Sequence, residues 1–191
     1  MFDYPKNLIL ASGSPRRKEL LAGLDLPFEV KILPDVDESY PDNLQGKEIP
    51  EYIARQKANA YLPLMKDDTL VITADTIVWL NGKVFGKPEN KQEAKQMLRN
   101  LSGKTHEVIT GICLTTKHKQ RIFSVLTEVS FAVLSDEEID YYVEKYSPLD
   151  KAGAYGVQEW IGYIGVENIK GSYFNVMGLP VQQLYRELRL M

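Results

Sequence analysis

One long apolar segment, residues 70–80, constrains the fold more than any other part of the chain, because it carries a single carboxylate, Asp75, at its centre. Its continuous apolar character predicts a buried strand. The segment ends at Asn81-Gly82, a pair typical of a tight hairpin turn. A lone buried carboxylate is costly unless a cation, a metal ion or hydrogen-bond donors compensate it. We therefore expect a positive group to face Asp75. The alternative is an Asp that caps a break between two strands, with Thr76 as a local partner.

The remaining apolar spacing predicts helices and strands in mixed order. Helices are expected at 15–24, 50–64, 91–101, from a capping box at Ser135 to about 146, and after Pro180, where Val181, Leu184 and Leu188 would be buried. Strands are expected at 7–11, at 28–33, in a hairpin of 107–116 with 121–134, and in a last pair around 161–169. In 121–134 the spacing places these side chains on one face: Phe123, Val125, Val129, Phe131 and Val133. Hairpins mixed with single helices favour an α/β fold with a mixed or largely antiparallel sheet.

The segment Ser12-Gly13-Ser14-Pro15-Arg16-Arg17-Lys18 follows the first predicted strand and opens a helix. Cations are unusual there, because the N-terminal end of the helix dipole is already positive and favours anions. Backbone N–H groups, hydroxyls and guanidinium groups at one helix start can bind a phosphate. The alternative is an ordinary Ser-Pro N-cap followed by solvated cations.

Other charged residues fit the same chemistry. Lys57 lies on the apolar stripe of its predicted helix, where it either pairs with an acid or extends its ammonium to solvent. Lys87, in Gly86-Lys87-Pro88, follows the hairpin that Asp75 enters and can return towards that acid. An acidic loop contains Asp35, Asp37 and Glu38. Magnesium binds a few carboxylates together with substrate phosphates, although a solvated acidic loop is the alternative.

The loop at 150–158 has small residues around one Tyr and ends at Gln158, whose amide offers a donor and an acceptor to a nucleobase edge. Neither His106 nor His118 shows the spacing of a zinc site, and the common nucleotide-binding motifs are absent from the sequence. Together the charged segments and this loop suit a triphosphate that is held by cations and bridged by magnesium.

Composition limits the class of protein. The 191 residues, 44% hydrophobic and 26% charged, predict one domain over 1–191, with two small lobes possible. A net charge of −3 disfavours nucleic acid and anionic membranes as partners. The single cysteine, Cys113, lies in an apolar run and is predicted to be a core residue. With no apolar stretch long enough to span a membrane, a cytoplasmic location is the expectation.

At these motifs the chain resembles the Maf family of nucleoside triphosphate pyrophosphatases. The matching segments occur in the family's order: residues 10–17, Asp37-Glu38, 54–58, 74–78, 86–88, 101–106, 148–158, 171–173 and 176–180. Ser147 departs from the family, which commonly has Glu before Pro-Leu-Asp-Lys-Ala-Gly. The departure affects none of the residues to which a role is carried over.

The resemblance implies an elongated α/β fold, similar to inosine triphosphate pyrophosphatase, with a mixed, largely antiparallel sheet flanked by helices and a cleft between two lobes. It implies a homodimer and a metal-dependent hydrolysis of a nucleoside triphosphate, with magnesium or manganese, to the monophosphate and pyrophosphate. Ala74-Asp75-Thr76 and Gln158 resemble the branch that acts on dTTP and UTP. The alternatives are a pyrophosphatase for noncanonical or methylated nucleotides and a nucleotide-binding regulator of cell division that acts through a protein partner.

By the same resemblance, individual residues receive roles. Asp75 is the proton acceptor, and the residues that set substrate choice are Arg16, Thr76 and Gln158. The phosphate-binding residues are Ser14, Arg17, Lys57 and Lys87. Glu38 and Asp75 are the metal ligands. Whether Asp75 acts directly as a base or by holding the metal is open at this point.

Overall fold

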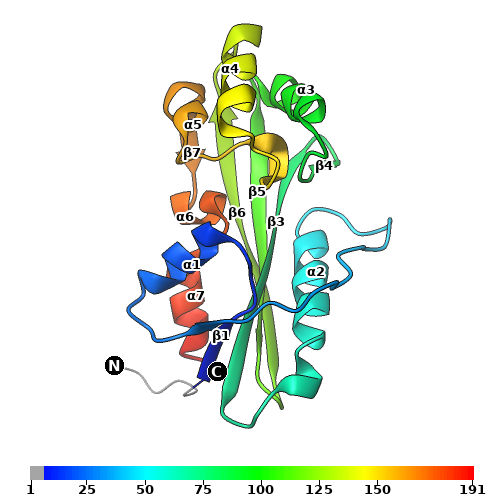
Figure 1. Ribbon diagram of the computed structural model, residues 1–191, viewed down its shortest axis with the longest axis vertical. Helices are drawn as coiled ribbons and strands as arrows, with labels where there is room; N and C mark the ends of the chain where they lie inside the picture. The colour runs from blue at the N-terminus through cyan, green and yellow to red at the C-terminus, as the bar shows by residue number, and fades with distance from the viewer. Residues whose placement is uncertain (1–6) are drawn as a thin grey trace. The chain divides into compact units, whose positions relative to one another are not determined.

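The computed structural model describes residues 7–191 and contains a mixed β-sheet with the strand order β2-β1-β3-β5-β6-β7, while β4 pairs with β3 (Figure 1). The strands are β1 (Asn7–Leu10), β2 (Glu29–Val30), β3 (Thr69–Leu80), β4 (Lys83–Phe85), β5 (Thr105–Thr115), β6 (Gln120–Phe131) and β7 (Val166–Lys170). β1 pairs in parallel with β2 and β3, whereas β4 pairs antiparallel with β3, and β7 antiparallel with β6. The predicted α/β class with a mixed sheet is confirmed.

The chain divides into two compact units, and it passes from one unit to the other several times. Unit 1 is Met1–Asp75, Thr110–Val125 and Gly178–Met191, and unit 2 is Thr76–Ile109 and Leu126–Met177. Strands β3, β5 and β6 each contribute residues to both units. The prediction of one domain over 1–191 stays a prediction, and its first six residues lie outside the described residues.

The helices of unit 1 are α1 (Pro15–Ala22), α2 (Glu48–Asn59) and α7 (Val181–Leu188). The helix predicted over 50–64 instead ends at Asn59 and is followed by a short 3₁₀ helix, Leu62–Leu64. Pro63 has no N–H to donate, so the α-helical hydrogen bonding cannot continue through it. The closing helix α7 buries Leu184 and Leu188 as predicted, whereas Val181 is only half-buried.

The strand predicted over 28–33 is reduced to the two residues of β2. Just beyond it, the N–H of Lys31 still donates to the carbonyl of Leu10 in β1 at 3.2 Å, but the next backbone groups bond to a side chain. The Tyr61 hydroxyl donates to the carbonyl of Lys31 at 2.7 Å and accepts from the N–H of Leu33 at 3.1 Å. A tertiary contact therefore replaces the strand pairing that the apolar pattern predicted.

Unit 2 contains α3 (Lys91–Leu101), α4 (Asp136–Tyr146), α5 (Trp160–Gly165) and α6 (Tyr173–Met177), of which α3 and α4 pack against each other (Figure 1). The predicted capping box opens α4. Ser135 Oγ accepts from the N–H of Glu138 at 3.2 Å, and the Glu138 carboxylate accepts from the N–H of Ser135 at 2.8 Å. The core of this unit includes Leu98, Leu101, Phe131, Tyr142 and Ile161.

Two predictions in unit 2 are wrong. The first half of the strand pair at 161–169 is the helix α5, in which Gly162 lies so close to the preceding turn that a Cβ would be 1.9 Å from the carbonyl oxygen of Val157. Val133, predicted to lie in the strand 121–134 on one face with Val129 and Phe131, is outside the strand and 84% exposed. The alternation stops because β6 ends at Phe131, after which the N–H of Ala132 donates to the carbonyl of Gly165 at 2.8 Å.

Two further predictions are confirmed. Asn81 and Gly82 adopt φ of 51° and 78°, the left-handed backbone that a tight hairpin needs, and Leu80 pairs with Lys83. Cys113 is fully buried, and burial raises the pKa of its thiol, as expected of a core cysteine. Among the helices over residues 7–191, none is long and apolar enough to cross a membrane.

Candidate active site

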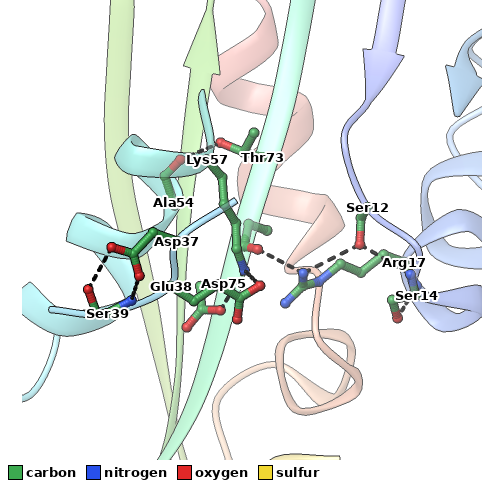
Figure 2. Close-up of polar contacts among 11 residues, drawn as sticks. Ser12, Ser14, Arg17, Asp37, Glu38, Ser39, Ala54, Lys57, Thr73 and Asp75 are labelled. Carbon is green, nitrogen blue, oxygen red and sulfur yellow. Dashed lines mark hydrogen bonds and ion pairs between the residues drawn. The ribbon is translucent and has the colours of Figure 1, made fainter. Parts of the chain in front are cut away.

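Asp75 lies within the unbroken strand β3 and faces a lysine of helix α2. The Lys57 ammonium lies 2.9 Å from Asp75 Oδ1, and each of these side chains is only 14% exposed (Figure 2). A cation therefore faces the buried acid, as the sequence predicted. The continuous strand excludes an Asp that caps a break, and the ion pair excludes a Lys57 that extends to solvent.

Lys57 also contacts a second carboxylate. Its ammonium lies 3.1 Å from Glu38 Oε1, and the Glu38 side chain is 51% exposed. The neighbouring acid, Asp37, is engaged locally instead, because it accepts hydrogen bonds from the N–H and the hydroxyl of Ser39 at 2.8 and 2.9 Å (Figure 2). These two bonds lower the pKa of Asp37. Of this acidic pair, therefore, Glu38 is the residue that reaches the Lys57–Asp75 ion pair.

The start of α1 supplies the next group. Ser14 is the N-cap of the helix, and its hydroxyl accepts from the N–H of Arg17 at 3.4 Å. The Arg17 guanidinium donates through Nε to the carbonyl of Gly178 at 2.9 Å and through one terminal nitrogen to that of Ala74 at 2.8 Å. Burial lowers the pKa of Arg17, and the charge of Asp75 opposes this effect. Arg17 is thus held at the backbone of the residue before Asp75.

The packing of α2 against the sheet determines the position of Lys57. The buried Thr73 hydroxyl donates to the carbonyl of Ala54 at 2.7 Å, which ties the helix to β3 two residues before Asp75. At Gly111 of β5, a Cβ would lie 2.3 Å from the carbonyl carbon of Pro50, so only glycine permits this approach of helix and strand. Both contacts set the distance across which Lys57 reaches Asp75.

The remaining predicted site residues, Thr76, Lys87 and Gln158, belong to unit 2, whereas Arg16, half-buried in the first turn of α1, belongs to unit 1. Lys87 is exposed and follows Gly86, whose carbonyl accepts from the N–H of Gly153 at 3.0 Å. The loop of Lys87 is therefore bonded to the loop that leads to Gln158. The Gln158 Oε1 atom is buried and has no hydrogen-bond partner among residues 7–191.

The donor set of unit 1 fits a divalent cation that a nucleotide helps to hold. Glu38 and Asp75 both contact the Lys57 ammonium, so two carboxylates meet at one place. Magnesium usually takes one or two carboxylates and completes its shell with water and substrate phosphates. Within residues 7–191 there is no group of three or more His, Cys, Asp or Glu that could hold a metal by protein ligands alone.

Two contacts at this site were not foreseen from the sequence, namely the carbonyl groups of Ala74 and Gly178 that hold Arg17. Every residue carries a backbone carbonyl, so the sequence contains no signal that would single these two out. The glycine at 178, within the segment 176–180, was the one available indication of a close approach.

The α/β fold is similar to that of a solved structure of the Ham1 protein from Staphylococcus aureus. The likeness has a TM-score of 0.50 at 18% identity and covers 95% of this chain and 98% of that chain, so it concerns the fold alone. The protein belongs to the Maf family, since the family model described as Maf-like protein matches residues 7–191.

Similar relatives carry a specific name. A protein of Phocaeicola vulgatus named dTTP/UTP pyrophosphatase is 66% identical over 182 residues, which are 95% of this chain and 94% of the relative. A Bacteroides thetaiotaomicron protein of the same name is 64% identical over the same shares of both chains. One from Porphyromonas gingivalis, also so named, is 55% identical over 95% of this chain and 92% of the relative.

Proposed function

We propose that this protein is a pyrophosphatase that hydrolyses dTTP and UTP to the nucleoside monophosphate and pyrophosphate. Family membership and the names of relatives 55–66% identical over 95% of the chain support the assignment. The single observation that carries the chemistry is the Lys57–Asp75 ion pair at 2.9 Å within a largely buried part of unit 1. Hydrolysis of a triphosphate would use both a carboxylate and a cation, and this ion pair supplies one of each.

Asp75 would accept the proton of the water that attacks the α-phosphorus. The bond between the α-phosphorus and the bridging oxygen breaks, and pyrophosphate leaves with that oxygen. The contact of Lys57 with Oδ1 orients the carboxylate, so that its other oxygen can receive the proton. Reactions of this kind depend mainly on positioning and electrostatic stabilisation, which the cations provide.

The other basic groups would bind the triphosphate. We assign this role to Lys57, Lys87, Arg17 and the hydroxyl of Ser14, because helix starts and guanidinium groups are suited to phosphate oxygens. Glu38 and Asp75 would hold magnesium or manganese. When bound, the cation would neutralise negative charge on the phosphates.

Gln158, together with Arg16 and Thr76, would select the base. Thymine and uracil present an N3–H donor between two carbonyl oxygens, whereas cytosine presents an N3 acceptor. The buried Gln158 Oε1 has no partner within residues 7–191 and is suited to accept from N3–H, while Nε2 donates to a neighbouring carbonyl. A hydrogen bond of this kind is worth about 1–3 kcal/mol, which corresponds to about 5- to 150-fold in selectivity.

The test is a substrate panel of dTTP, UTP, CTP, ITP and methylated GTP with magnesium and purified protein, with identification of the products. The proposal expects dTTP and UTP to lead and pyrophosphate to be released. Release of orthophosphate, or binding without turnover, would contradict it. Asp75→Asn should lose about 10² to 10⁴-fold in kcat, and retention of more than about a tenth would exclude a general base.

The family resemblance also supports a homodimer, which light scattering after size-exclusion chromatography tests. We further propose that the protein acts in the cytoplasm, where its nucleotide substrates occur, and localisation of a tagged full-length chain tests this. A net charge of −3 supports the expectation that nucleic acid is not a partner.

A further inference from the structure

The loop that ends at Gln158 is held in place by three side chains, those of Tyr142, Lys151 and Glu159. The Tyr142 hydroxyl, on α4, donates to Glu159 Oε2 and accepts from the N–H of Gly156 at 3.0 Å. The Lys151 ammonium lies 3.1 Å from Glu159 Oε1. The Tyr142 hydroxyl therefore bonds to residues on both sides of Gln158, namely the N–H of Gly156 and the carboxylate of Glu159.

Glu159 is well placed for a role other than helix capping. It is the N-cap residue of α5, yet its side chain makes no capping hydrogen bond and turns back towards Tyr142 and Lys151. The three side chains are largely removed from solvent, since Tyr142 is fully buried and the side chains of Lys151 and Glu159 are 9% and 20% exposed. Charged groups in such surroundings interact more strongly than they do in water.

The carboxylate of Glu159 and the amide of Gln158 both approach Gly156. A Cβ on Gly156 would be 2.8 Å from the carboxyl carbon of Glu159 and 3.1 Å from Nε2 of Gln158, so both groups crowd the same side of Gly156. A carboxylate attracts the amide N–H groups and repels the amide oxygen. It therefore favours the rotamer in which Nε2 faces Glu159 and Oε1 is directed elsewhere as an acceptor.

The hydroxyl that holds Glu159 keeps its proton at any working pH. Burial raises the pKa of Tyr142 far above its usual range, and its hydrogen bond to Glu159 adds to the effect. The hydroxyl consequently remains a donor to the carboxylate. The arrangement is continuous with the loop of Lys87 through the bond from the Gly153 N–H to the Gly86 carbonyl at 3.0 Å.

We propose that Glu159, held by Tyr142 and Lys151, is a positioning residue that fixes the orientation of the Gln158 amide and so makes the enzyme prefer bases with an N3–H donor. The inference rests on the proposed function, in which Gln158 contacts the base. If the carboxylate is neutralised, the amide can rotate by a half-turn, and Nε2 can then donate to the N3 acceptor of cytosine.

The test compares kcat/KM for UTP and CTP, because these two nucleotides differ only at the N3 and C4 edge of the base. Glu159→Gln, which keeps the shape and removes the charge, should lower the ratio of UTP to CTP about tenfold, the equivalent of one modest hydrogen bond. Tyr142→Phe should lower it in the same direction. The matched controls are Glu167→Gln, which removes one charge from the exposed part of β7, and Tyr146→Phe on the same helix as Tyr142.

Three results would overturn the proposal. One is an unchanged ratio of UTP to CTP in Glu159→Gln, and another is an equal loss of activity with UTP and CTP, as general damage to the fold would produce. The third comes from the Gln158→Ala background, where Glu159→Gln should have no additional effect on the ratio; an additive effect would show that Glu159 does not act through Gln158.

The same experiment separates this inference from the proposed function. A wild-type protein that releases no pyrophosphate from UTP would refute the proposed function itself. A wild type that prefers UTP while Glu159→Gln keeps the same preference would refute the positioning role alone.

Discussion

His106 provides a quantitative test of the buried core of unit 2. It lies in β5 and is 1% exposed, with Nε2 2.8 Å from the Tyr155 hydroxyl and its ring edge-on to Phe131 at 5.1 Å. Nδ1 has no hydrogen-bond partner among residues 7–191. Burial lowers the pKa of His106 from 6.5 to about 4, because the imidazolium would lose its hydration there.

The sign of the pH effect follows from this lowered pKa. Between pH 4 and 6.5 the unfolded chain binds a proton at His106 that the folded chain does not, so lowering the pH favours unfolding. Above pH 6.5 the group has no effect on stability. The loss is about 1.4 kcal/mol for each pH unit below that value, and about 3 kcal/mol in all by pH 4.

The measurement is urea unfolding of the wild type and of His106→Gln, which can still bond Tyr155, at about pH 7.5 and about pH 5. The wild type should lose about 2 kcal/mol more than the variant over this range. His118→Gln, which removes the other, exposed histidine, should retain the wild-type pH dependence. Parallel pH profiles for the wild type and His106→Gln would refute the reasoning.

Two further predictions concern Lys57 and the packing of its helix α2 against β5. Lys57→Met removes the cation that contacts Asp75 and should lower kcat/KM for dTTP about 10- to 150-fold, which corresponds to the loss of one charge-assisted hydrogen bond. The control is Arg55→Met, which removes a cation from the exposed side of α2 and should change kcat/KM by no more than about twofold. Similar kinetics in both variants would remove Lys57 from the mechanism. Gly111→Ala brings a Cβ to within 2.3 Å of Pro50 and should cost about 1–3 kcal/mol in urea unfolding; wild-type stability would contradict the close approach of α2 and β5.

Much of the fold follows from local patterns in the sequence. The bounds predicted for α3 agree with the structure, as does the capping box of α4, because their spacing and end signals lie within a few residues. The apolar run with a central acid predicted both the strand β3 and a cation facing Asp75. The errors occur where a distant group decides the local structure, as with the Tyr61 hydroxyl that replaces strand pairing beyond β2.

By itself, the sequence determined that Asp75 would be buried in a strand and would need a positive partner, since burial and charge are properties of the residues and their spacing. Only the tertiary structure decided which partner: Lys57, 18 positions earlier, on a helix that Gly111 allows to approach the sheet. It alone directed Arg17 to the carbonyl of Gly178, 161 positions away. The physical reason is that backbone carbonyls and close contacts between elements leave no distinctive residue in the sequence, so these choices arise only when the chain packs.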